Sequence, residues 1–306
     1  MDHDSVYDGL LGEDSTHWAF GNGQDFDGRE DPLAGVDTTI PEGIEAAALA
    51  TYCLMLGDDA LVYAHRLSQW CSRAPDLEED IALANIALDL LGQARLLLGR
   101  AAAAEAGVVP RLPGDSPVPA EDALAFFRDD AGFRNVRLVE AANGDFAVTI
   151  ARLLLFSTWR LALLERLAGS RDPVLSAIAA KGVKEVTYHR DYAGRWFLTL
   201  ARGTDESHAR LLDAVTQVWA GHDELFAPHE VEMRLAGVAV DPSVLVAEVG
   251  DVLDQVFAAS GVERPAVGQL GLVAGGRGRD GRHTEALSLL LAEMQSVARA
   301  HPSGRW

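Results

Sequence analysis

The sequence predicts an all-α protein built around a bundle of long helices. Its 306 residues are 48% apolar and 24% charged, which is enough to bury a sizeable core and excludes disordered and disulfide-stapled proteins. Residues 76–106 run for about thirty positions without a proline or a loop signal, and helices of that length are typical of antiparallel bundles. No run of alternating polar and apolar residues is long enough to require a sheet.

The N-terminal part of the chain is expected to be an irregular arm. Residues 1–38 are rich in Gly and Asp and lack a sustained period, which is typical of loops. Residues 39–306 are expected to form a single helical domain. A hydroxyl cap, a proline and an acidic residue at 38–42 predict a first helix over 42–73, which Gly57-Asp58-Asp59 can interrupt.

The second long helix begins at an acidic capping box. Asp76 stands three residues before Glu79, the spacing at which both side chains can bind free amides of the first turn. Four prolines between residues 107 and 119 then predict a crossing loop. Further helices are expected at 121–128, 144–169, 173–202, 205–226, 243–259 and 284–300, with a loop rich in Gly and Arg at 275–282. The long helices 42–73, 76–106, 144–169 and 173–202 dominate.

The charge balance limits the partners of the chain. The 46 acidic and 26 basic side chains give a net charge of −20, which repels nucleic acid and anionic membranes. The two cysteines, Cys53 and Cys71, are expected to be buried thiols rather than a disulfide. Neither a secretory leader nor eighteen uninterrupted apolar residues are present, so the sequence predicts a cytoplasmic protein with no membrane partner.

Polar residues interrupt the apolar face of the second long helix. Asn85, Asp89 and Gln93 follow one another at intervals of four and project from one side. Asp89 lies among leucines, where an unpaired carboxylate would cost several kcal/mol. Either it has a partner on a facing helix or this side is solvated.

The third and fourth long helices carry further polar groups. The fourth holds the only two lysines of the chain, and Glu185 and His189 stand four positions apart, so that they can interact. Carboxylates and a histidine on the inner faces of a four-helix bundle are similar to the di-iron carboxylate architecture. The polar residues that these two helices contribute are Lys181, Lys184, Glu185, Tyr188, His189 and Tyr192 on the fourth helix, and Asp145, Thr149 and Arg152 on the third.

The motif that a di-iron site needs is missing. Two copies of Glu-x-x-His supply the metal pair in that architecture, but Asp89-x-x-Gly92 lacks an imidazole and Glu185-x-x-Tyr188 has a phenol instead. Asp205-x-x-His208 lies at a helix start, where Asp205 is better explained as a cap. The inner polar residues of the bundle therefore fit a set of ion pairs better than a metal site. Separately, Arg277, Arg279 and Arg282 of the 275–282 loop are candidates for contact with the phosphates of a ligand such as coenzyme A.

Six segments of the sequence carry a resemblance to a known family, and together they span about residues 50 to 300. They are Leu56-Gly-Asp-Asp-Ala-Leu, the stretch from Glu78 to Arg95, Asn143-Gly-Asp-Phe-Ala, Lys184-Glu-Val-Thr-Tyr-His189, Glu206-Ser-His and Glu293-Met-Gln. The stretch from Glu78 to Arg95 is long enough to be specific. These segments resemble the family of C subunits of the bacterial phenylacetyl-CoA epoxidase, a multicomponent ring monooxygenase of phenylacetate degradation.

The resemblance implies a ferritin-like fold without catalytic or metal-binding residues in this chain. It implies a structural subunit that stabilises a homologous catalytic A subunit, which holds the di-iron centre, beside a reductase with flavin and iron–sulfur cofactors. The chain alone would then have no activity. The former metal positions would hold an ion network of Asp89, Asp145, Lys184, Glu185, Tyr188 and His189. An independent di-iron oxygenase and an unrelated helical scaffold remain alternatives, and contact between two copies of the chain stays open.

Overall fold

The all-α prediction is confirmed by the computed structural model, which describes residues 33–114, 116–265 and 276–304. These residues contain ten α-helices and no β-strand. The described residues from 36 onward form one compact unit, and most of the predicted arm, 1–38, lies outside the described residues.

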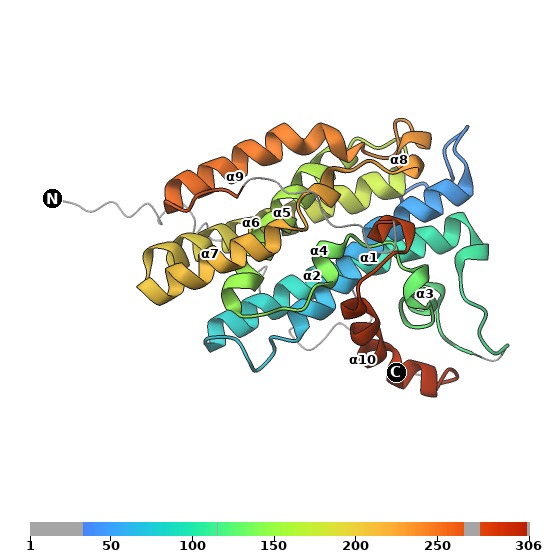
Figure 1. Cartoon of the computed structure of the whole chain (residues 1–306). Helices are drawn as coiled ribbons and strands as arrows, with labels where there is room; N and C mark the ends of the chain where they lie inside the picture. The colour runs from blue at the N-terminus through green and yellow to red at the C-terminus, as the bar shows by residue number, and fades with distance from the viewer. Residues whose placement is uncertain (1–32, 115, 266–275, 305–306) are drawn as a thin grey trace. The chain divides into compact units, whose positions relative to one another are not determined.

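Two helical hairpins form the bundle (Figure 1). Helices α1 (Ala46–Ser68) and α2 (Leu77–Ala104) form the first, and α5 (Phe146–Leu167) and α6 (Pro173–Arg202) form the second. The hairpins meet where α2 packs against α6. The most apolar stretch of α5 is completely buried, so α5 lies in the core of the unit.

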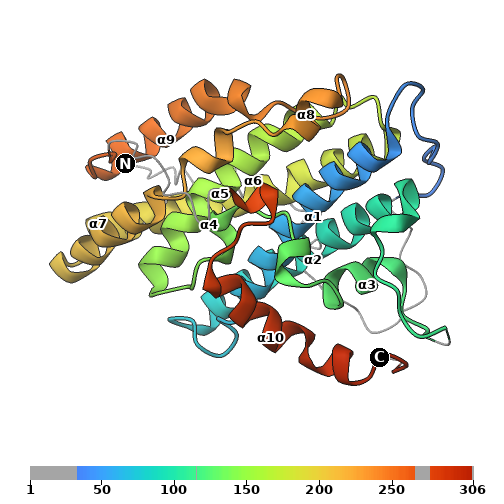
Figure 2. The same cartoon turned by 45° about the vertical axis from the view of Figure 1, so that its right-hand side comes forward.

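Shorter helices surround the bundle. Helices α7 and α9 pack on α5 and α6, whereas α3 packs on α2 and is itself covered by α10 (Figure 2). The short α4 and α8 pack on α1. Their bounds are Ala120–Phe126 for α3, Arg137–Glu140 for α4, Asp205–Trp219 for α7, Glu230–Arg234 for α8, Val246–Ser260 for α9 and Glu285–Ala300 for α10.

Acidic caps begin three of the long helices. Asp76, Asp145 and Asp172 each accept a hydrogen bond from the amide three residues on, at 2.9–3.0 Å. The predicted bounds of α6 are confirmed at both ends. The capping box of α2 is only half formed, because the Glu79 side chain turns to α6 and accepts a hydrogen bond from Trp196 Nε1 at 2.7 Å.

The first predicted helix is wrong at both ends and in its interior. It covers Ala46–Ser68 instead of 42–73, and Glu45 rather than a hydroxyl residue precedes it. Gly57-Asp58-Asp59 does not interrupt it, because both carboxylates are fully buried against partners from other segments. The predicted helix 205–226 also ends early, at Trp219, and a 3-10 turn follows at Asp223–Phe226.

The prediction for the two cysteines is confirmed for one and wrong for the other. Cys53 of α1 is buried, whereas Cys71 lies in the turn after α1 and is exposed. Both are free thiols, so they form no disulfide with each other.

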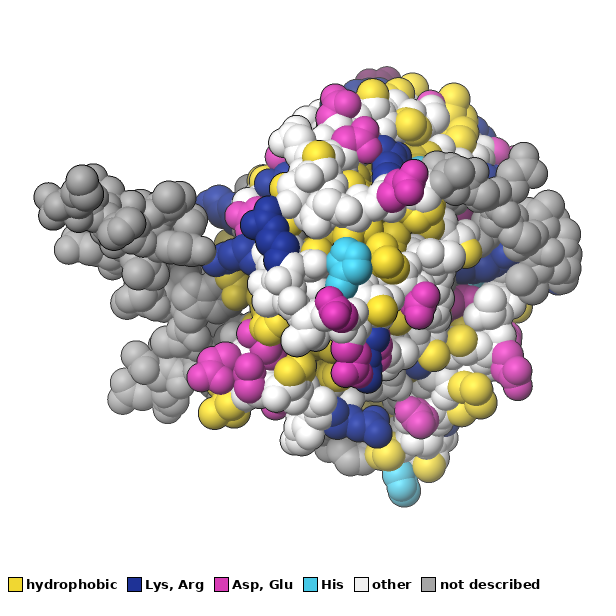
Figure 3. Space-filling model, turned by 60° about the vertical axis from the view of Figure 1, so that its left-hand side comes forward, with side chains coloured by type: hydrophobic (Ala, Val, Ile, Leu, Met, Phe, Trp, Pro, Cys, Tyr) yellow, Lys and Arg dark blue, Asp and Glu magenta, His cyan; other side chains and the backbone are white. Residues whose placement is uncertain are grey.

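Three helices, α1, α2 and α5, are long and apolar enough to cross a membrane by length and composition. In α1 and α5, 83% and 100% of the most apolar stretch is buried within the protein, against 44% in α2. On the face drawn in Figure 3, acidic, basic and hydrophobic side chains are interspersed.

Candidate functional site

The Asp89–His189 pair joins α2 to α6. His189 Nε2 lies 3.0 Å from Asp89 Oδ2, with the imidazole buried and the carboxylate about a quarter exposed. Asp89 therefore has the facing partner that its apolar neighbours require. The fourth-helix residue in this contact is His189.

A second polar connection crosses the centre of the bundle. Arg160 of α5 donates from Nε to Gln93 Oε1 of α2 at 3.0 Å, and Gln93 Nε2 donates to Glu185 Oε2 of α6 at 2.9 Å. Arg160 Nη1 also donates to the Leu56 carbonyl of α1 at 3.3 Å. The residues Arg160, Gln93 and Glu185, here called the core polar chain, thus touch all four long helices.

The guanidinium of Arg160 is fully buried. Burial lowers its pKa to about 10, against the opposing attraction of Asp59 and Glu185. The group still keeps its proton at neutral pH, so a permanent positive charge lies in the bundle core. Its Nη2 has no hydrogen-bond partner in the described part of the chain, which marks this as a costly arrangement.

The predicted ion network forms only in part. The ion pair to Glu185 comes from Lys181, one turn before the exposed Lys184. Asp145 caps α5 and lies 3.7 Å from Arg210 of α7, away from the group. Tyr188 stacks on Tyr192 with ring centroids 6.4 Å apart, and burial raises the pKa of Tyr188.

The donor set does not fit a di-iron centre. Such a centre needs four carboxylates and two imidazoles directed inward from four helices. The core polar chain offers one carboxylate, one amide and one cation. Within the described residues, no group of three or more His, Cys, Asp and Glu side chains is arranged to hold a metal ion.

Packing also limits the space at this point. A Cβ added to Gly182 of α6 would lie 2.9 Å from Leu164 of α5 and 3.4 Å from the Gln93 side chain. The backbone of α6 therefore approaches α2 and α5 closely, as only glycine permits here. This contact holds Gln93 between Arg160 and Glu185.

A second buried network holds the C-terminal segment 276–284, here called the strap. Arg279 of the strap is fully enclosed, and its Nη2 lies 2.7 Å from Asp59 Oδ2 of α1. Its Nη1 donates to the carbonyls of Met55 and Arg134 at 2.7 and 2.8 Å. The prediction that Arg279 meets a ligand's phosphates is therefore wrong, because a carboxylate of the chain itself takes the charge.

The other two arginines of that prediction differ from Arg279. Arg277 stands 3.7 Å from Asp280, and its side chain is about 30% exposed. The side chain of Arg282 is exposed, while its carbonyl accepts a hydrogen bond from Arg137 at 3.0 Å. Contact of Arg277 and Arg282 with coenzyme A stays a prediction.

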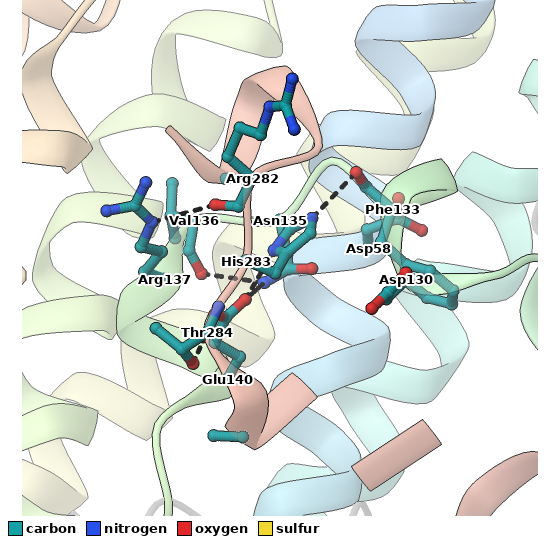
Figure 4. Close-up of polar contacts among 12 residues, drawn as sticks. Asp58, Asp130, Phe133, Asn135, Val136, Arg137, Glu140, Arg282, His283 and Thr284 are labelled. Atoms are coloured by element: carbon teal, nitrogen blue, oxygen red, sulfur yellow. Dashed lines mark hydrogen bonds and ion pairs between the residues drawn. The ribbon is translucent and has the colours of Figure 1, made fainter. Parts of the chain in front are cut away.

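His283 of the strap lies between two hydrogen-bond acceptors (Figure 4). Its Nδ1 lies 2.7 Å from Glu140 Oε2 and its Nε2 lies 3.0 Å from the Phe133 carbonyl. Both ring nitrogens must donate to satisfy both contacts, so the geometry favours the imidazolium. Burial opposes that charge, but the hydrogen bond and the charge of Glu140 outweigh it and raise the pKa of His283.

Sequence reasoning overlooked Asp58, Asp59 and Arg160. Arg128 Nη1 donates to Asp58 Oδ2 at 3.0 Å, so adjacent carboxylates of α1 bind arginines from two different segments. The available signal was the placement of these charges within long, mostly apolar segments, with both aspartates inside 48–64 and Arg160 inside 150–164. A charge that such a segment buries needs a partner.

Comparison with known proteins identifies the family. The model of the phenylacetic acid catabolic protein family matches residues 37–306. The chain is also 44% identical over 260 residues to the C subunit of the 1,2-phenylacetyl-CoA epoxidase of Escherichia coli strain K12, an alignment that covers 84% of this chain and 99% of that protein. The chain belongs to the phenylacetic acid catabolic protein family.

Proposed function

We propose that the chain is a non-catalytic structural subunit of a multicomponent phenylacetyl-CoA epoxidase. In this role it pairs with the di-iron catalytic A subunit in the cytoplasm and stabilises it during aerobic phenylacetate catabolism. The chain itself holds no cofactor. The iron belongs to the A subunit, and the flavin and iron–sulfur groups belong to the reductase.

The core polar chain carries this proposal. In a di-iron bundle, inward carboxylates of four helices are neutralised by two metal ions. In this chain the only carboxylate of the group, Glu185, instead reaches the buried cation Arg160 through Gln93. The permanent charge of Arg160 supplies electrostatic balance without metal, and the Asp89–His189 pair closes the same α2–α6 contact.

A core polar chain of this kind is compatible with the helical bundle but cannot replace the metal ions in catalysis. In a di-iron bundle, oxygen activation needs a metal with open coordination positions, and a guanidinium offers only hydrogen-bond donors. The similarity to the C subunit of the Escherichia coli enzyme agrees with a role beside a catalytic subunit. The A subunit as the specific partner rests on the family resemblance described above.

Reconstitution of activity tests the proposal. The chain, the A subunit and the reductase are purified separately and mixed with phenylacetyl-CoA, NADPH and O2, and the epoxide is measured by mass spectrometry. We expect product only when the A subunit is present, and a lower yield or a less stable A subunit when this chain is omitted.

Two outcomes would contradict it. Epoxide from this chain and the reductase without the A subunit would make the chain an independent oxygenase. Failure of the chain to co-purify with the A subunit, or to alter its yield and stability, would make it an unrelated helical scaffold.

A further inference from the structure

Helix α2 has an apolar face that the rest of the described chain leaves exposed. The most apolar stretch of α2 has the same mean hydropathy as that of the buried α5. Less than half of this stretch is buried in α2, whereas all of it is buried in α5. Leu77, Ile81 and Leu88 are 68%, 53% and 45% exposed. At about 100° per residue, these three positions fall within about 40° of one another on the helix, so they form one continuous strip.

Two glycines extend this strip toward the end of the helix. A Cβ added to Gly92 or Gly99 would meet nothing within 4 Å, so no other segment of the described chain lies against them. Both fall within about 60° of Leu77 around the helix axis. The residues Leu77, Ile81, Leu88, Gly92 and Gly99 are here called the α2 outer face. The exposed Arg95 lies on the same side of the helix between the two glycines, and each glycine lets another helix approach the backbone closely.

A groove and a cavity, both mainly apolar, lie beside the α2 outer face. A groove of about 190 Å³ is lined by Leu91 and Arg95 of α2 together with Asp122 and Phe126 of α3. Asp122 and Phe126 also line a cavity of about 680 Å³ that reaches α10 at Val297. A continuous apolar surface of this extent is unusual on a protein that works alone, and it is typical of a protein–protein interface.

The charges around the face indicate what covers it. Glu78 and Asp80 of the first turn of α2 flank the exposed Leu77. The whole chain has a net charge of −20 and only two lysines, so a second copy would bring like charges together. A partner with an apolar helical face and basic residues near the start of α2 fits better, because opposite charges speed association and exclude wrong partners.

We propose that the α2 outer face is the surface on which the catalytic A subunit docks through a long helix of its own. This inference rests on the proposed function and assigns the contact to one face of the molecule. At 28 residues, α2 is about 42 Å long, which is long enough to carry one side of an interface of ordinary size.

Binding measurements with matched variants test this assignment. The dissociation constant between the purified A subunit and the full chain is measured for the natural chain, for Leu88→Asp and for Leu212→Asp. Leu212 lies on α7 and is 40% exposed, against 45% for Leu88, so it controls for an added charge at similar exposure. Melting curves of each variant alone confirm that it folds.

We expect Leu88→Asp to raise the dissociation constant by about tenfold or more, because a charge replaces an apolar contact at the centre of the interface. Leu212→Asp should leave it unchanged. An unchanged constant for Leu88→Asp, with the natural chain still binding, would overturn the assignment to α2. A dimer of the chain alone that Leu88→Asp dissociates would also overturn it, in favour of a second copy. No binding by the natural chain would instead contradict the proposed function.

Discussion

The Arg279–Asp59 pair gives the sharpest prediction of stability. Arg279→Ala removes a guanidinium that lies 2.7 and 3.1 Å from the two Asp59 oxygens and 2.7 and 2.8 Å from two carbonyls. The Asp59 carboxylate would stay fully buried without its main cation. Burial already raises the pKa of Asp59 against the attraction of Arg279, so loss of the arginine should raise it further.

The expected loss of unfolding free energy is about 3–5 kcal/mol, as found when one partner of a buried ion pair is removed. At roughly 2–4 °C for each kcal/mol in a domain of this size, the melting temperature should fall by about 10 °C. Urea unfolding followed by circular dichroism measures the change as a shift of the midpoint.

The control for this variant is Arg282→Ala in the same strap. The Arg282 side chain is exposed, so its removal should change the unfolding free energy by less than about 0.5 kcal/mol. Asp59→Asn combined with Arg279→Ala should recover part of the loss, because neither charge is then left alone. A loss below about 1 kcal/mol for Arg279→Ala would refute the view that this pair holds the strap to α1.

Three further predictions concern other parts of the chain. The folded-state pKa of His283 is raised by Glu140. The stabilising contribution of His283 should therefore be complete below the unfolded pKa of about 6.5 and should disappear as the pH rises through the folded pKa. His283→Gln should flatten this dependence of the unfolding free energy on pH, measured from pH 5 to 9. Gly182→Val should destabilise the bundle by about 1–3 kcal/mol in urea unfolding because its Cβ would lie 2.9 Å from Leu164, and a smaller loss would mean that α6 can shift. Lys184→Met should leave the unfolding free energy within about 0.5 kcal/mol because this lysine is exposed, and a larger loss would return Lys184 to the ion network.

The sequence predicts the long helices well because their signals are local. Apolar spacing and acidic caps define α2, α5 and α6 to within a few residues. The first helix was harder. A Gly-Asp-Asp segment has the composition of a break, and only tertiary partners explain why Asp58 and Asp59 stay helical and buried.

The candidate site was less predictable than the fold. Spacing along one helix correctly places Asp89 and Gln93 on the same side of α2, because helical geometry alone decides that. That this side meets α6 rather than solvent was left open and is seen only in the structure. It cannot decide which of two lysines reaches Glu185, nor that Arg160 comes from a neighbouring helix to meet Gln93. Those contacts depend on the packing of one helix against another, which a single sequence does not specify.

The central proposal is that the core polar chain takes the place of a metal site, so that this chain does not bind iron by itself. The most direct test is metal analysis of the purified chain, after it has been loaded with ferrous iron, desalted and compared with the A subunit treated in the same way. We expect far less than one iron per copy of this chain and about two per copy of the A subunit, as in di-iron proteins. About two irons per copy in this chain alone would contradict the account.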